Sequence, residues 1–173
     1  MFKLFDVLKR GLGGAAAGPT PAAPVPAVSL PAAPWNTESD FIHEDQFELG
    51  TLIALFRRVM LSFEIDADSL VVETESAHVR VMIDTDRKIL VMRTLYRFRD
   101  SSDYEARLRL ANRLNASLIL VRFSVVDDDM LYADYCLLYQ RGLPAFHIVN
   151  SLRRFALVAR NGLRECDSED LIA

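Results

Sequence analysis

The chain has 173 residues, of which 51% are hydrophobic and 25% are charged, a composition typical of a globular protein. Its 20 basic and 24 acidic side chains give a net charge of −4, which argues against nucleic acid as the main partner. Two cysteines, Cys136 and Cys166, are too few for a disulfide framework and too far apart for a zinc site. This cysteine usage indicates a reducing compartment, and we expect the cytoplasm.

The first 35 residues differ in composition from the rest of the chain. Phe2, Phe5 and Leu8 recur at helical spacing, so residues 1–12 are predicted to form a short amphipathic segment. Residues 13–40 are rich in Gly, Pro and Ala, which predicts a disordered linker. Two interpretations of the segment stay open. It is either a frayed terminus, or a peptide that docks on a partner or a membrane surface through Phe2, Phe5 and Leu8.

The folded domain is expected over residues 41–164, and its first half predicts a helix and three strands. The helix opens near Asp45, and its apolar positions form one stripe: Leu49, Leu52, Ile53, Phe56, Val59 and Met60. Asp66 to Asp68 is turn chemistry, and a β-rich run follows from Leu70 to Glu75. Two further strands, VRVMID and KILVMRTLYRF, flank the polar residues 85–87, which is a hairpin signature.

The second half predicts a helix, a hairpin and a final helix. Ser102 and Glu105 form a capping box for a helix that runs through Asn115. Its expected buried positions are Tyr104, Leu108, Ala111 and Leu114. A three-residue loop of Asp127, Asp128 and Asp129 brings two sets of side chains to one face: Ile119, Val121, Phe123 and Val125 with Leu131, Ala133, Tyr135 and Leu137. The same register sets Arg122 opposite Asp134.

The last predicted helix follows Gly142 and Pro144. Its inward positions are Phe146, Val149, Leu152, Phe155, Ala156 and Ala159, and Gly162 fits its C-terminus. Residues 165–173 are then an acidic tail, which we expect to be mobile.

This order of elements, α-β-β-β-α-β-β-α, predicts an α+β fold with an antiparallel sheet packed against helices. The stretches FEIDADSLVVET, LANRLNASLILVRFSVVDDDMLYADYCLLYQRGL and FALVARNGL resemble the bacterial YbjN-like domains, whose fold is similar to that of type III secretion chaperones. The resemblance spans about residues 44 to 163 and implies a regulator related to sensing or stress. It supplies no catalytic residue. Its Asn-x-x-Asn feature matches Asn112 and Asn115, interpreted as hydrogen-bonding residues at a helix end.

No motif in the sequence predicts catalysis or metal binding. His43, His78 and His147 lie in three different elements, and none has a partner at metal-ligand spacing. No Ser or Cys follows the strand-turn-helix pattern of an activated nucleophile. We therefore expect no enzymatic activity, no metal and no cofactor.

The alternation of KILVMRTLYRF predicts an unusual outer sheet face. An even hairpin turn pairs Ile83 with Leu90 and Asp84 with Ile89, so one set of residues points away from the helices: Arg80, Met82, Ile89, Val91, Arg93, Leu95 and Arg97. Solvated sheet faces are usually polar, so apolar residues rimmed by arginines favour a partner-binding surface. The alternative is that long Arg stems simply cover scattered apolar residues.

Three functional hypotheses follow. The first is a non-enzymatic protein-interaction module, homodimeric, which binds a protein segment through this face. The second is a small-ligand sensor or a motif-less enzyme that uses Arg122, Asp134, Asn112 and Asn115. The third is a regulator recruited to a membrane through residues 1–12. Nucleic acid is not an expected partner, because the chain beyond the +2 leader carries a net charge of −6.

Overall fold

The computed structural model describes residues 40–127 and 129–173, so residues 1–12 and nearly all of 13–40 lie outside the described part. The elements are β1 (Phe41–Ile42), the 3-10 helix η1 (Glu44–Gln46), α1 (Leu49–Arg58), β2 (Phe63–Asp66), β3 (Ser69–Glu73), β4 (His78–Asp84), β5 (Ile89–Arg97), α2 (Tyr104–Ser117), β6 (Arg122–Val126), β7 (Met130–Leu138), β8 (Leu143–Pro144) and α3 (Ala145–Cys166). The expected α+β class and antiparallel sheet are confirmed.

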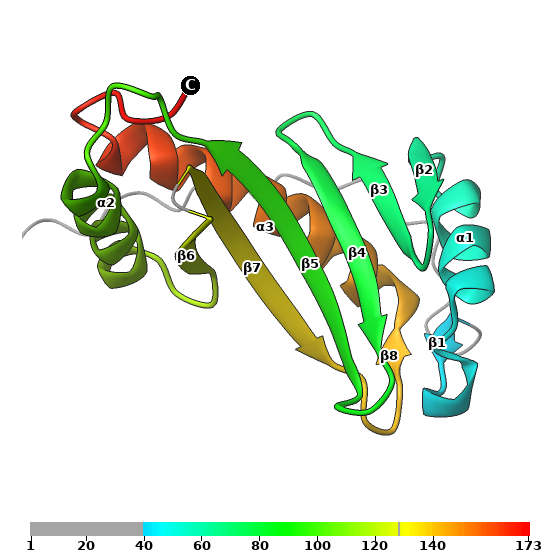
Figure 1. The fold of residues 1–173 in the computed structure, drawn as a ribbon. Helices are drawn as coiled ribbons and strands as arrows, with labels where there is room; N and C mark the ends of the chain where they lie inside the picture. Colours follow the sequence, from blue (N-terminus) through cyan, green and yellow to red (C-terminus); the bar gives the residue numbers. More distant parts are fainter. Residues whose placement is uncertain (1–39, 128) are drawn as a thin grey trace, which may run out of the picture. The chain divides into compact units, whose positions relative to one another are not determined.

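Six strands form one antiparallel sheet in the order β2-β3-β4-β5-β7-β6, and β1 pairs with β8 in a separate two-stranded ribbon. The long helix α3 runs behind the sheet and contacts β4, β5 and β7 (Figure 1). Its buried side chains include Ile148, Leu152, Phe155 and Ala159, which pack with the inward residues of the strands. The hydrophobic core therefore lies between α3 and one face of the sheet.

Helix α1 begins at Leu49, later than expected, because Glu44–Gln46 form a separate 3-10 turn. Its buried side chains are Leu52, Leu55 and Phe56. Met60 follows the helix with a positive φ of 55° and is 90% exposed, so its place in the apolar stripe was wrong. The prediction extended the helical period beyond Arg58, where α1 ends, and so placed Met60 on the apolar side of a helix that does not include it.

The six-stranded sheet contains one strand more than the five that the sequence predicts, and the two-residue strands β1 and β8 were not predicted either. β2 pairs with β3 across a tight turn in which Asp66 lies opposite Ser69. Ala67 adopts a left-handed φ of 52° in that turn, so the turn over residues 66–68 is confirmed. β2 has the sequence FEID, which alternates apolar and charged residues, but its four residues are the shortest run that supports a strand prediction.

Two expectations for α2 were wrong. The N-cap is Asp103, whose side chain accepts a hydrogen bond from the Ala106 amide at 2.8 Å, and Ser102 instead donates to the Arg99 carbonyl. The buried side chains of α2 are Ala106, Leu110, Ala111 and Leu114, so Ala111 and Leu114 are confirmed, whereas Tyr104 and Leu108 are exposed because the buried stripe is centred on Leu110 and Leu114.

The register of the second hairpin is confirmed. Val126 lies opposite Met130 across the Asp127 to Asp129 loop, and Arg122 lies opposite Asp134. Asp127 takes the left-handed conformation, with φ 51°. Ile119 is nevertheless 85% exposed, because β6 begins only at Arg122 and the positive φ of Leu120 turns the chain before it.

The C-terminal part departs most from expectation. Gly162 lies inside α3, where a Cβ atom would meet Leu118 Cδ1 at 2.4 Å, so it serves close packing and not helix termination. The end of the chain is part of the domain. Leu171 is buried, Ile172 forms a β-bridge with Phe98, and the Arg99 amide donates to the Leu171 carbonyl.

Candidate protein-interaction surface

The seven predicted partner-binding residues lie on one face of the sheet. Arg80 lies opposite Arg93 and Met82 opposite Val91, as expected from the even turn between β4 and β5. Ile89, Leu95 and Arg97 continue the same alternation along β5. We call this side, opposite to α3, the outer face.

The two faces differ sharply in burial. On β5 the inward residues Leu90 and Met92 are fully buried, whereas Val91 is half-buried and Leu95 is 43% exposed. Among the described residues, no helix lies over the outer face, which is turned toward the viewer in Figure 1. The face thus presents apolar side chains without a covering layer from residues 40–127 and 129–173.

One row of side chains crosses all six strands on the outer face. Its members, from one edge of the sheet to the other, are Glu64, Val71, Arg80, Arg93, Asp134 and Arg122. Adjacent members of such a row are direct cross-strand neighbours, so their charges interact. The row begins with a carboxylate at the β2 edge and ends with a guanidinium at the β6 edge.

Asp134 is the polar centre of this face. Its Oδ1 accepts a hydrogen bond from Arg93 Nε at 2.6 Å, and its Oδ2 accepts from Nη2 of both Arg93 and Arg122 at 3.2 Å. The Arg93 guanidinium also lies 4.6 Å from the centre of the Tyr132 ring. These contacts cover Asp134, whose side chain is only 4% exposed although no helix in the described part of the chain shields it. The hydrogen bonds to Asp134 raise the pKa of Arg93 above its ordinary value.

Two further ion pairs hold the arginines around this centre. Arg80 donates to Asp66 Oδ2 at 2.6 Å and to the Ser69 hydroxyl at 2.8 Å, and Arg97 pairs with Asp129 at 3.0 Å. Each of these guanidiniums is therefore fixed by a carboxylate of its own chain. Fixed guanidiniums present their planar faces in a defined direction, as recognition surfaces require.

The sequence prediction missed the contribution of β7. Because β7, and not β6, lies next to β5, Tyr132, Cys136 and Leu138 join the outer face. The order of strands from separate hairpins depends on tertiary packing. The alternation of residues within a strand carries no information about that order. The available signal was charge, since Asp134 complements Arg93 as well as Arg122.

The four residues of the ligand-sensor hypothesis do not converge on one site. Arg122 and Asp134 lie on the outer face, whereas Asn112 is exposed on α2. Asn115 uses its side-chain amide to bind the β6 backbone: its Oδ1 accepts from the Phe123 amide at 2.8 Å and its Nδ2 donates to the Phe123 carbonyl at 2.9 Å. This asparagine therefore takes the place of a neighbouring strand at the β6 edge.

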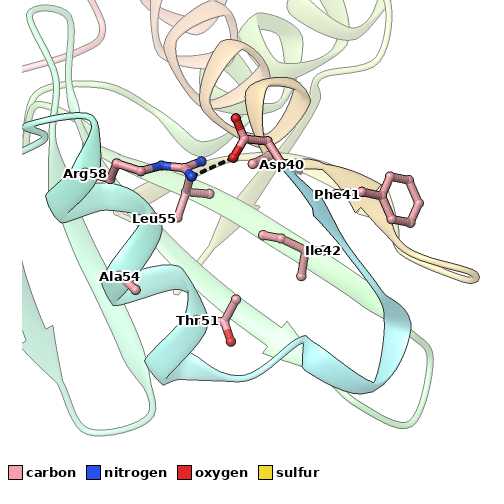
Figure 2. Close-up of a pocket in the computed structure, with 8 residues that line it drawn as sticks. Asp40, Phe41, Ile42, Thr51, Ala54, Leu55 and Arg58 are labelled. Carbon is pink, nitrogen blue, oxygen red and sulfur yellow. Dashed lines mark hydrogen bonds and ion pairs between the residues drawn. The ribbon is translucent and has the colours of Figure 1, made fainter. Parts of the chain in front are cut away.

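A separate hollow of about 210 Å³ lies between α1 and the β1 segment (Figure 2). Ile42, Thr51 and Leu55 line it, and Asp40 accepts a 2.6 Å hydrogen bond from Arg58 at its rim. This ion pair neutralises the buried carboxylate of Asp40. The hollow offers mainly apolar contacts.

The described residues contain no cluster of three or more His, Cys, Asp or Glu side chains that could hold a metal ion. Burial and the neighbouring Asp134 raise the pKa of the Cys136 thiol, which disfavours the reactive thiolate. In the part of the chain that the structure describes, no helix combines the length and apolar character needed to cross a bilayer. Phe2, Phe5 and Leu8 lie outside the described residues, so the docking of residues 1–12 stays a prediction.

Comparisons with known proteins address the fold and the family. No curated protein sequence matches the chain. The crystal structure of YbjN, described as a putative transcription regulator from E. coli, is similar to this structure with a TM-score of 0.58 and 17% sequence identity, over 72% of this chain and 95% of that one. At this identity, the likeness concerns the fold. The family model YbjN, described as "Putative bacterial sensory transduction regulator", matches residues 51–167. This match covers more than half of the chain and includes the outer face, and the chain therefore belongs to the YbjN family.

Proposed function

We propose that this chain is a non-enzymatic regulator that acts by binding a protein segment through the outer face of its sheet. One observation carries the proposal. The outer face joins exposed or half-buried Met82, Val91 and Leu95 to a set of fixed guanidiniums, and no described helix covers it. Surfaces that combine apolar residues with arginine are typical of protein interfaces. We place the protein in the cytoplasm, in keeping with its two free cysteines.

The family description supports the regulatory part of the proposal, since it names a sensory transduction regulator and no reaction. The side chains support the non-enzymatic part. Asp134, the one nearly buried carboxylate among the described residues of the outer face, is already bound to Arg93 and Arg122. A carboxylate held by two guanidiniums is a poor general base.

The decisive test replaces Val91 and Leu95 together by glutamate. Both side chains are partly exposed, so we expect the V91E/L95E chain to fold with an unfolding midpoint close to that of the wild type. It should lose the ability to bind protein through this face, because two buried carboxylates would lack partners in the interface. Binding is measured by affinity capture from the native cell lysate with quantitative mass spectrometry, alongside self-association.

A matched control is Arg109→Glu on α2, which changes the surface charge without touching the sheet. This variant should capture the same proteins as the wild type. If V91E/L95E folds and still binds every partner of the wild type, the interface lies elsewhere. If it unfolds, these residues belong to a packed layer and the proposal fails.

A further inference from the structure

We infer that the outer face binds the outer face of a second copy of this chain, with a two-fold axis along the strands that brings Glu64 of each protomer to Arg122 of the partner subunit. This inference rests on the proposed function, because it names the partner of the same face.

The distribution of charge over the outer face points to this partner. The midline of the sheet runs between β4 and β5, with three strands on each side. Outward residues on the β2-β3-β4 half include Glu64, Asp66, Glu73 and Asp84 against one guanidinium, Arg80. Outward residues on the β5-β7-β6 half include Arg93, Arg97 and Arg122 against one carboxylate, Asp134.

Residues in the two hairpin loops reduce this imbalance. Arg87 pairs with Asp84 at 2.8 Å, and Asp129 pairs with Arg97 at 3.0 Å. When the described loop residues are counted (Asp86, Arg87, Lys88, Asp127 and Asp129), the β2-β3-β4 half still has more acidic than basic side chains, whereas the β5-β7-β6 half has as many basic as acidic ones. A copy turned end for end across the midline places this acidic half over the balanced half of the partner, so that two acidic halves do not face each other.

The geometry of face-to-face packing selects the direction of the axis. A two-fold axis that runs along the strands between the two sheets places β2 of one protomer over β6 of the other, and β4 over β5. An axis across the strands would instead place each half over the same half of the partner and would oppose the two acidic halves. Aligned packing of sheets, about 10 Å apart with strands about 30° from parallel, is a common arrangement.

The ends of the charged row provide the specific contact. Glu64 is exposed, and among residues 40–127 and 129–173 it has no ion-pair partner. Arg122 is 72% exposed and contacts Asp134 through one nitrogen, so its other donors face outward. Both residues belong to the same row and lie on opposite edge strands. The axis along the strands therefore brings Glu64 of each protomer to Arg122 of the partner subunit, which gives two such contacts in each dimer.

The middle of the interface adds no uncompensated charge. Arg80 and Arg93 face each other across the axis, but each is neutralised by a carboxylate of its own chain, Asp66 and Asp134 respectively. Met82 and Val91 lie in the next row, directly opposite one another across the midline of each sheet. The predicted interface thus combines apolar side chains and internally paired arginines at its centre with ion pairs at its ends.

The test uses the full chain with two single charge reversals, Glu64→Arg and Arg122→Glu. Sedimentation velocity of the wild type should show a dimer. In each variant homodimer, two attractive pairs become two repulsive ones, and we expect dimerisation to weaken roughly tenfold or more. An equimolar mixture of the two variants should restore the dimer, because each introduced charge then meets its opposite on the other chain.

Restoration in the mixture is the critical outcome, since a variant that merely destabilises the fold is not rescued by the other. Dimerisation of Arg109→Glu should equal that of the wild type. If the wild type is a monomer over the whole concentration range, or if the mixture dissociates like its components, this inference is overturned. The proposed function would still be judged separately, by whether V91E/L95E loses the captured proteins.

The two free cysteines give an independent readout. Cys136 is exposed on the outer face next to Val91, whereas Cys166 lies at the end of α3. Alkylation of Cys136 should slow as the protein concentration rises through the dimerisation range, while the rate at Cys166 stays constant. Equal behaviour of both thiols would contradict a face-to-face dimer.

Discussion

The two faces of the central sheet are built from alternate residues of the same strands, yet they follow different rules. On β5, Leu90, Met92 and Thr94 are buried against α3, while Val91 and Leu95 have no covering helix among the described residues. Residues on both faces therefore form the same strand, although only those on the inner face are buried. The difference teaches that the hydrophobic free energy of burial is gained mainly on the inner face, whereas apolar side chains of the outer face stay partly exposed.

A matched pair of leucines gives the largest expected effect. Leu90→Ala removes a fully buried side chain and should lower the free energy of unfolding by about 2–5 kcal/mol. Leu95→Ala, on the same strand but on the outer face, should cost less than about 1 kcal/mol in the monomer. Urea unfolding at protein concentrations low enough to favour the monomer measures both values. Equal losses would mean that both faces are packed alike.

The ion pairs of Asp134 are expected to stabilise the outer face of the monomer. Asp134→Asn removes the negative charge that fixes Arg93 and Arg122, and we expect a loss of about 1–3 kcal/mol. Arg122→Gln should cost less than about 1 kcal/mol, because that side chain is largely exposed. Chemical unfolding of both variants decides the order. A neutral Asp134→Asn variant would show that this ion cluster serves recognition alone.

At the β6 edge of the sheet, the side chain of Asn115 takes the place of a neighbouring strand. Asn115→Ala leaves the amide and carbonyl of Phe123 without their partners, and we expect a loss of about 1–2 kcal/mol. Asn112→Ala, one helical turn earlier on the exposed side of α2, should be neutral. Hydrogen exchange at the Phe123 amide provides a local readout, and it should accelerate only in the Asn115 variant. Unchanged exchange would contradict the edge-capping role.

The smallest effect concerns acid titration at the end of the outer face. The Arg87 amide, and then its guanidinium, favour the ionised form of Asp84 and lower its pKa below the ordinary 3.8. The stabilising contribution is therefore complete above the ordinary pKa and is lost as the pH falls through the lower folded value. NMR titration of the Asp84 carboxyl carbon measures this pKa. Arg87→Gln should raise it only part of the way, since the amide hydrogen bond remains.

The sequence predicted most of what depends on local alternation. The pairing of Ile83 with Leu90, and of Arg122 with Asp134, followed from turn length and period alone, and both registers are confirmed. This parity correctly assigned all seven outer-face residues to one side. Local sequence decides side-chain direction in a strand, because successive residues alternate by geometry.

Features that depend on distant contacts were not predicted. Gly162 matched a helix end by residue type, but its role is set by Leu118, 44 positions earlier in the chain. The tail looked too acidic to pack, yet Leu171 fills a site that Phe98 and Arg99 help to form. The Arg93–Asp134 contact was missed for the same reason, because it requires β7 to lie beside β5.

The substitution of Asn115 for a strand neighbour limits how copies of this protein can polymerise. Open-ended fibre growth by strand addition needs two different free edges, so that the last strand of one molecule can pair with the first strand of the next. At the β6 edge, the Phe123 backbone is already occupied from within the same chain. A strand added at that edge would have to displace these two hydrogen bonds, so growth of a continuous sheet through successive molecules is disfavoured there.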